Sequence, residues 1–377
     1  MGWTLAESFI GIGFVTVVFA LSSGTKRHFI PEVDSTSFVF LQYTTASVIG
    51  LMMWLIAGYP TLSNLDSTQY AKAICIFLGG FVCLVVDFLI FAAIRHFNSF
   101  VVMGTYLVLS SPLGVILNYF IDDEDINPGY LFGGTALAFV GLLFVLASNY
   151  LLEEHRVLRK YPNSEEHGES AQLLHRDDEV QPTSQSQVLG TRTQQQKDEL
   201  SQKVFWFWLL IITGVLGCSW SVLPAYGDSG TDGITEISLV ILIFFIGCVA
   251  AMPTCVFVFC HLEMFGANVV DYQGVVPMFQ RLCSYNWYQL SVSVLIGCVY
   301  GCAYVCYFYS TVSSDLPTAA SMALYMSAIV ITSLACIFIF GDYVDVHFYS
   351  WPIFYLVVGM LLYAAAIFTI VSYSIVY

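Results

Sequence analysis

The stretch Ala73–Ile94, AICIFLGGFVCLVVDFLIFAAI, contains one charged residue, Asp87, in an otherwise apolar run. A run of about 20 apolar residues is long enough to cross the hydrocarbon core of a bilayer as a helix. A helix is required there because lipid offers no partner for unpaired backbone N–H and C=O groups. This stretch therefore predicts a transmembrane helix that carries a carboxyl group.

Nine further apolar runs of similar length lie along the 377-residue chain. Hydrophobic residues make up 58 % of the chain and charged residues only 10 %, whereas soluble domains carry about 25 % charged residues. The sequence therefore predicts an all-α membrane protein with ten transmembrane helices. We expect them at Leu5–Ser23, Phe38–Ala57, Ala73–Ile94, Phe100–Ile121, Gly129–Leu152, Val204–Leu223, Ile237–Cys260, Gln289–Ser310, Pro317–Phe340 and Trp351–Ser372.

The segment Glu153–Lys203 differs from the rest of the chain because it is rich in Gln, Ser, Glu and Arg and nearly free of aromatic residues. Such a segment cannot bury enough apolar surface to fold by itself. We therefore expect a disordered linker at 153–203. It separates residues 1–152 from residues 204–377, and each part holds five of the predicted helices.

Two homologous halves with five spans each must lie in opposite orientations in the membrane. A shift of the sequence by 218 residues superposes Gly79 on Gly297 and Gly141 on Gly359, and it also superposes Glu124 on Asp342. These matches predict two inverted five-helix repeats. Inverted repeats with a substrate site at their interface are typical of secondary transporters.

The basic residues predict the orientation of the chain. Eleven of the 12 Lys and Arg residues fall on one side of the predicted membrane, and only Lys72 falls on the other. Because cytoplasmic loops carry an excess of Lys and Arg, we expect a cytosolic linker and non-cytosolic termini. The net charge of −15 arises mainly in loops, and no basic stripe of the kind that binds nucleic acid is present in the sequence.

The sequence lacks the motifs of membrane enzymes, so we expect neither enzymatic activity nor a cofactor. Intramembrane aspartyl proteolysis needs two deep aspartates, and the zinc motif His-Glu-x-x-His and the serine motif Gly-x-Ser-x-Gly are absent from the sequence. Cys298, Cys302 and Cys306 share a helix face and could hold a soft metal. Buried cysteines that act as small hydrophobic residues are the simpler interpretation, and we expect no metal.

Asp87 is the first candidate for a functional residue. A charged side chain at the centre of a membrane helix costs about 2.5–3.5 kcal/mol on insertion scales, so it normally faces a cavity or a partner. A carboxyl group in that position can take up and release a proton, which suits proton coupling. The alternative is a carboxyl group that serves helix packing or reaches the interface near Arg95.

Polar and aromatic side chains on five other predicted helices are candidates for a substrate site. Sites for small ligands combine aromatic faces with a few hydrogen-bonding groups, although Ser and Thr also join membrane helices to each other. The candidates are Gln42, Tyr43, Ser110, Asn118, Trp220, Tyr300, Tyr304, Thr318 and Tyr325, with Thr105, Ser111, Ser219, Ser221, Tyr307 and Ser321 as further members.

The linker contains the sequence Glu169-Ser170-Ala171-Gln172-Leu173-Leu174. Glu169, Leu173 and Leu174 have the spacing of an acidic dileucine sorting signal, which clathrin adaptor complexes read on the cytosolic face. This motif indicates a lysosomal or vacuolar address, with the plasma membrane as the alternative. A chance match is the other interpretation of so short a pattern.

Several short motifs resemble those of the ureide permease family, which belongs to the drug/metabolite transporter superfamily. They are Leu117-Asn118-Tyr119-Phe120-Ile121-Asp122-Asp123, Ile126-Asn127, an opening Gly79-Gly80 in the third span, Gly214-Val215-Leu216-Gly217 through Ser221 to Pro224-Ala225, and Phe340-Gly341-Asp342-Tyr343. The resemblance implies a ten-span carrier with a long cytosolic central loop that transports allantoin, uracil or related heterocycles. The segment Phe40-Leu41-Gln42 resembles sugar-transporter-like members of the same superfamily to the same degree. The chain departs from the permease pattern at Val86-Asp87, where that family has Gly-Asn, and at Tyr304, and no nucleotide-binding-loop motif occurs in the linker.

We therefore predict a secondary active transporter of a small polar metabolite, with a proton-coupled ureide or nucleobase symporter as the leading form. A sugar or nucleotide-sugar transporter of the same superfamily is the alternative within the class. A multi-pass membrane scaffold or receptor without transport activity is the alternative from another class. The expected partners are a small-molecule substrate, protons, the lipid bilayer and an adaptor that binds the linker.

Overall fold

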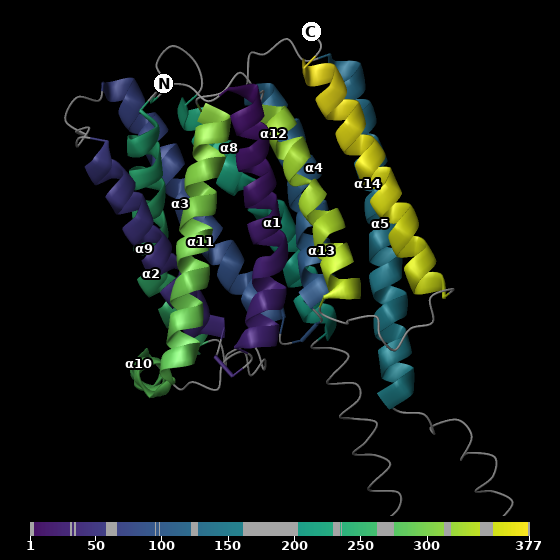
Figure 1. Cartoon of the computed structure of the whole chain (residues 1–377), viewed down its shortest axis with the longest axis horizontal. Coiled ribbons are helices and arrows are strands. Elements are labelled where there is room, and N and C mark those ends of the chain that lie inside the picture. The colour runs from purple at the N-terminus through teal and green to yellow at the C-terminus, as the bar shows by residue number, and fades with distance from the viewer. Residues whose placement is uncertain are drawn as a thin grey trace, which may run out of the picture.

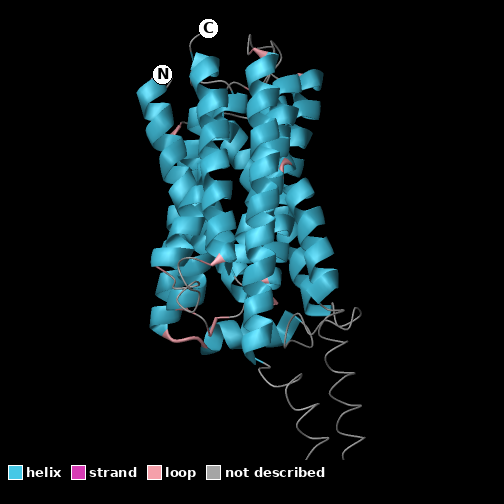
Figure 2. Ribbon diagram, turned by 90° about the vertical axis from the view of Figure 1, so that its right-hand side faces the viewer, coloured by secondary structure: helices cyan, strands magenta, loops and turns pink. Residues whose placement is uncertain are grey.

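The computed structural model describes residues 4–30, 32–33, 35–57, 66–94, 96–97, 99–121, 127–160, 203–228, 234, 236–261, 275–312, 318–339 and 350–375. Within these ranges the regular structure is helical, without a strand. The long helices run side by side along one common direction, whereas α10 lies across it (Figures 1 and 2), and both chain ends lie at the same end of the bundle. They are α1 (Leu5–Phe29), α2 (Ser35–Ile56), α3 (Ser67–Ala93), α4 (Ser99–Ile121), α5 (Pro128–Lys160), α8 (Ser219–Asp228), α9 (Ile237–His261), α10 (Val275–Ser284), α11 (Trp287–Val312), α12 (Thr318–Tyr325), α13 (Ser327–Phe338) and α14 (Trp351–Ile375).

Ten spans in the described part of the chain are long and apolar enough to cross a membrane, which confirms the predicted all-α membrane fold. The outer surface is apolar, as a lipid-facing surface requires: Trp208, Leu295 and Phe368 are 62 %, 62 % and 72 % exposed. Polar side chains such as those of Gln42 and Asn118 are instead fully buried. This distribution is the one expected of a bundle whose surroundings are lipid.

The place of Gly79 and Gly80 in the third span differs from the expected one. Gly79 and Gly80, which we expected to open the third span, lie near the middle of α3, because the helix already begins at Ser67 after the capping residue Asp66. A Cβ atom at Gly80 would overlap the carbonyl oxygen of Phe244 in α9. The glycine is thus required for the close approach of two backbones.

Two of the predicted spans are interrupted. The sixth, Lys203–Gly227, breaks at Cys218 before α8, and the ninth breaks at Met326 between α12 and α13. Directly after each break a serine hydroxyl, that of Ser219 (2.6 Å) or Ser327 (2.7 Å), donates to the carbonyl three residues earlier. Such bonds compete with the helical hydrogen-bond ladder, which gives a physical reason for breaks that hydropathy did not predict.

The short helix α10 was also not predicted, because its ten residues are too few to span a bilayer. It lies at the end of the bundle opposite the chain termini (Figure 1), where it contacts α2 and α9. Phe279 of α10 packs edge-to-face on Phe40 of α2, with 5.6 Å between ring centroids. Hydrophobic periodicity is a weak signal over so short a segment.

The helix contacts repeat when the two halves are exchanged. The first span, α1, packs on the eighth span, α11. With the halves exchanged, α8 of the sixth span packs on the third span, α3. In the same way α2 packs on α11 and α9 packs on α3, while α5 and α14 form the pair at one edge of the bundle (Figure 1). Gly141 and Gly359 meet across that pair. A Cβ atom at Gly141 would lie 3.2 Å from the carbonyl oxygen of Gly359, and one at Gly359 would lie 3.1 Å from the carbonyl oxygen of Gly141. These are the two glycines that the 218-residue shift superposes.

Candidate functional site

The carboxylate of Asp87 lies inside the bundle on α3, with 6 % of the residue exposed. The hydroxyls of Tyr43 on α2 and Tyr300 on α11 both donate to its Oδ2 atom, each at 2.8 Å. No described residue donates a hydrogen bond to Oδ1. One oxygen is therefore held by the protein, and the other is left for a proton, a water molecule or a ligand.

A second set of hydrogen bonds orients Tyr43. Its oxygen lies 3.2 Å from the hydroxyl of Tyr304 and 3.3 Å from the sulfur of Cys83, and those two groups are 2.7 Å apart. Because Tyr43 gives its own hydrogen to Asp87, its oxygen can only accept from Tyr304 or Cys83. The network thus runs from Tyr304 and Cys83 through Tyr43 to the carboxylate.

The network joins the two halves of the chain. Tyr43, Cys83 and Asp87 come from α2 and α3, whereas Tyr300 and Tyr304 come from α11 in the second half. The two tyrosines are four residues apart, so they share one face of their helix. That face approaches α2 closely because Gly297, three residues before Tyr300, has no side chain. A Cβ atom at this position would lie only 2.8 Å from the carbonyl oxygen of Gln42.

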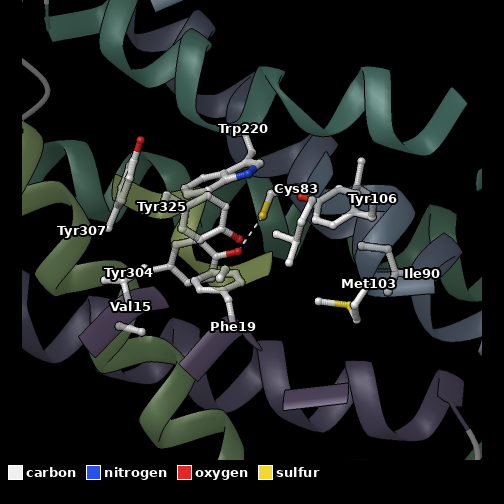
Figure 3. Packing of buried hydrophobic residues seen from close by; sticks show 14 of the residues in the cluster. Val15, Phe19, Cys83, Ile90, Met103, Tyr106, Trp220, Tyr304, Tyr307 and Tyr325 are labelled. Atoms are coloured by element: carbon white, nitrogen blue, oxygen red, sulfur yellow. Dashed lines mark hydrogen bonds between the residues drawn. The ribbon is translucent and has the colours of Figure 1, made fainter. Parts of the chain in front are cut away.

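Aromatic rings from α1, α8 and α12 pack against the tyrosines of the network, and Figure 3 shows Phe19, Trp220 and Tyr325 close to Tyr304 and Cys83. Phe19 of α1 lies 4.6 Å from Tyr300 and 5.2 Å from Tyr304 between ring centroids. Trp220 of α8 and Tyr325 of α12 both pack against Phe19, at 5.9 and 5.7 Å, and against each other at 5.8 Å. Six helices, α1, α2, α3, α8, α11 and α12, therefore meet around Asp87.

Trp220 and Tyr325 also occupy comparable positions beside the two helix breaks. Trp220 lies two residues after Cys218, where the sixth span is interrupted, and Tyr325 directly precedes Met326, where the ninth is interrupted. Their rings contact each other across the bundle. A change of angle at either break would therefore move an aromatic ring that covers the tyrosine network.

The structure brings six of the ten predicted substrate or coupling residues into this cluster: Tyr43, Asp87, Trp220, Tyr300, Tyr304 and Tyr325. The other four, Gln42, Ser110, Asn118 and Thr318, are buried as well, but no hydrogen bond joins them to the cluster. The side-chain polar atoms of Gln42, Ser110 and Asn118 have no protein partner among the described residues.

The further candidates have mixed surroundings. Tyr307 packs on Trp220 at 4.7 Å between centroids, while Ser219 and Ser221 donate to backbone carbonyls and serve the helix break. The hydroxyls of Thr105, Ser111 and Ser321 are buried without a described partner.

Three groups at the site were not identified as candidates from the sequence. Cys83 lies one helical turn from Asp87, and that spacing was the available signal. Phe19 and Phe244, whose ring lies 5.3 Å from Tyr304, are single members of a set of 30 phenylalanines. No local pattern distinguishes them.

Other predictions lie outside what the structure describes. Glu169, Leu173 and Leu174 of the sorting motif and Arg95 fall outside the described residues. Among the described residues, no group of three or more His, Cys, Asp or Glu side chains comes together as a metal site. Cys302 is exposed on the lipid-facing side of α11, and Cys298 and Cys306 are half-buried.

Comparison with known proteins finds a similar fold. A solved crystal structure, described only as that of a protein, is similar to this chain with a TM-score of 0.53 and 13 % identity, over 97 % of this chain and 98 % of that chain. At such identity the likeness concerns the fold alone. No protein-family model matches the chain, and no curated protein matches it. The fold and the site define an all-α multi-pass membrane protein with a buried carboxylate at its centre.

Proposed function

We propose that this chain is a secondary active transporter, which moves a small polar metabolite by alternating access and couples that movement to protons through Asp87. The observation that carries the proposal is the buried carboxylate of Asp87, which is held by tyrosines from both halves of the bundle. Ionisable groups inside membrane helices are costly and mark ion or substrate pathways and proton relays. A purely structural polar contact would need no ionisable group.

The arrangement of the helices supports alternating access. Substrate sites of transporters lie near the bilayer midplane at the interface of two repeats, beside interrupted helices. Here the Asp87 cluster lies between α2, α3 and α11, and the breaks at Cys218 and Met326 lie beside its aromatic cover. The reciprocal contact of Gly141 and Gly359 supports the division into inverted repeats at 1–152 and 204–377.

The substrate is a small polar molecule with a flat or compact apolar part, because the site offers aromatic rings together with phenolic hydroxyls. Nitrogenous heterocycles such as ureides and nucleobases, which the sequence resemblance implies, fit this description. Sugars, which also stack on aromatic rings, remain the alternative.

The cellular setting completes the proposal. The structure continues α5 to Lys160, eight residues into the predicted linker at 153–203. The rest of that linker is cytosolic and both termini are non-cytosolic, as the distribution of Lys and Arg predicts. The motif Glu169–Leu174 directs the protein to a lysosome or vacuole through an adaptor, and the plasma membrane is its destination without that signal.

Uptake by proteoliposomes tests the transport function. The purified full-length chain is reconstituted, an inward proton gradient is imposed, and labelled nucleobases, ureides and sugars are offered with protein-free liposomes as the control. Uptake of at least one compound, abolished when the gradient is collapsed, is expected. A protein that takes up none of them with or without a gradient would be better described as a scaffold or receptor.

A further inference from the structure

The third and the eighth span each pack on a pair of helices from the opposite half of the chain. α11 of the second half packs on α1 and α2, and α3 of the first half packs on α8 and α9. Six helices thereby form two groups that cut across the two sequence halves. We call α1, α2 and α11 unit A, and we call α3, α8 and α9 unit B.

Backbone contacts at glycines hold unit B together. A Cβ atom at Gly80 of α3 would overlap the carbonyl oxygen of Phe244 of α9, and one at Gly227 of α8 would lie 3.0 Å from the carbonyl oxygen of Lys72 of α3. The thiol of Cys248 in α9 also donates to the carbonyl oxygen of Gly80, at 3.2 Å. Backbone atoms cannot rotate out of the way as side chains can, so the three helices are held as one body.

Unit A is held in the same way. A Cβ atom at Gly301 of α11 would lie 2.9 Å from the Cα atom of Ala46 in α2, and Gly297, one turn earlier, contacts the backbone of α2 as well. Phe19 joins α1 to this pair, since its ring lies 4.6 Å from that of Tyr300 of α11 between centroids. In lipid, close contact of this kind is the main source of helix association.

The contacts between the two units are made by side chains. Tyr43 and Tyr300 of unit A both donate to Asp87 of unit B at 2.8 Å. Cys83 of unit B and Tyr304 of unit A form a further hydrogen bond, at 2.7 Å. All three hydrogen bonds therefore cross the boundary between unit A and unit B.

A glycine contact across the boundary also differs from those inside the units. Gly50 of α2 in unit A faces the ring of Phe245 of α9 in unit B, and not its backbone. A ring can change its rotamer, and a hydroxyl can exchange one hydrogen-bond partner for another. The boundary can thus break and form again while the contacts inside each unit persist.

We propose that units A and B, and not the two sequence halves, are the bodies that move against each other in the transport cycle. This inference rests on the proposed transport function and specifies how alternating access takes place, since transporters alternate access largely by rigid-body movement of one bundle against another. The hydrogen bonds of Asp87 lie on the boundary between the bodies. Its carboxylate therefore exchanges Tyr43 and Tyr300 for other partners whenever the boundary opens.

Distances between spin labels test which bodies move. The full-length chain in lipid nanodiscs carries a spin-labelled unnatural amino acid at two positions, so that the native cysteines stay in place. Trp287 of α11 and Val258 of α9 are exposed and belong to one sequence half but to different units. Ile74 of α3, which is also exposed, belongs with Val258 to one unit but to the other sequence half.

Each pair is measured by double electron–electron resonance in the otherwise wild-type chain and in the variant Tyr43→Phe/Tyr300→Phe, which removes two hydroxyls that bind the units to each other. The Trp287–Val258 distance should shift by several ångströms or split into two populations in this variant. The Ile74–Val258 distance should keep its wild-type distribution. Tyr300→Phe alone replaces the double variant if melting shows that the latter is unfolded.

Movement of the sequence halves predicts the reverse result, with a fixed Trp287–Val258 distance and a changed Ile74–Val258 distance. That result, a change in both distances, or a change in neither would overturn the inference. If proteoliposomes accumulate a compound in response to a proton gradient in any of these cases, the transport function stands and the division into units is wrong. If the distances change as expected but no compound is taken up, the units are correct and the transport function is wrong.

Discussion

The two oxygens of the Asp87 carboxylate have different surroundings, and this difference is the basis of the functional account. Oδ2 accepts hydrogen bonds from Tyr43 and Tyr300, and Oδ1 has no described donor. Hydrogen bonds to a charged acceptor are about twice as strong as neutral ones. The tyrosines can therefore hold the side chain in place while the other oxygen gains and loses a proton.

Removal of one tyrosine hydroxyl should affect this site and not the bundle as a whole. Tyr300→Phe deletes a buried donor to Asp87 and should destabilise the protein by about 1–3 kcal/mol, the cost of a lost hydrogen bond to a charged group. It should also change the pH dependence of uptake. Tyr355→Phe on α14, whose hydroxyl has no described bond, is the matched control. Thermal melting in detergent measures the difference, and equal melting temperatures for the two variants would show that the Tyr300 bond contributes nothing.

At the scale of helices, glycines decide how near the spans approach one another. Gly80 of α3 faces the Phe244 carbonyl of α9, and Gly247 of α9 faces the Phe77 carbonyl of α3. In lipid, helix association depends on such close van der Waals contact because apolar side chains gain little by leaving an apolar solvent. The pair of contacts fixes α3, and with it Asp87, against α9.

Gly80→Ala should therefore separate α3 from α9. The added methyl group meets backbone, which cannot rotate away, so we expect a loss of about 1–3 kcal/mol, typical of overpacking. Gly133→Ala in α5 provides the control, since nothing lies within 4 Å of its Cβ position and alanine is the better helix former. Melting curves and the yield of monodisperse protein measure the effect. Gly80→Ala with the stability of Gly133→Ala would contradict the described contact.

The spans themselves could be predicted because bilayer thickness sets a length that the sequence displays directly. Asp87 could be predicted because a lone charge in an apolar run is visible without a structure. Tyr300 and Tyr304 could be predicted because aromatic side chains with hydrogen-bonding groups suit a site for a small ligand. The hydrogen bonds from Tyr43 to Asp87 and between Cys83 and Tyr304 could not be predicted, since they join residues 44 and 221 positions apart in the chain. The breaks at Cys218 and Met326 depend on local side-chain hydrogen bonds, which leave no trace in hydropathy.

At the scale of the whole molecule, the charge distribution predicts the orientation in the membrane. An epitope inserted at 161–200 should be accessible to antibody only after the cytosolic face is opened, and epitopes at either terminus should show the opposite behaviour. Both chain ends lie at the same end of the bundle (Figure 1), so the two terminal epitopes should agree. Selective permeabilisation of the plasma membrane measures this. A terminus that labels together with the linker would contradict the predicted orientation.

The address of the protein should depend on the linker and its transport should not. Replacement of Leu173 and Leu174 by Ala removes the proposed adaptor motif and leaves every described residue unchanged, so we expect redistribution to the cell surface with unchanged uptake per molecule. Replacement of Leu152, which is buried in α5, is not an equivalent control because it removes packing. Gln172→Ala at the neutral position of the motif is the better one. An unchanged distribution of the double variant would identify the motif as a chance match.

Proton-driven accumulation by Asp87 variants tests the central claim most directly. Proteoliposomes with the wild type, Asp87→Glu or Asp87→Asn are compared from pH 5 to pH 8, with the compound that the uptake panel identifies. Asn keeps the size and one hydrogen-bonding oxygen but cannot titrate, whereas Glu keeps a titratable carboxyl group. The account predicts pH-dependent accumulation in the wild type, a weaker but still pH-dependent response in Asp87→Glu, and accumulation at the level of empty liposomes in a folded Asp87→Asn protein. A wild-type pH profile in Asp87→Asn would contradict it.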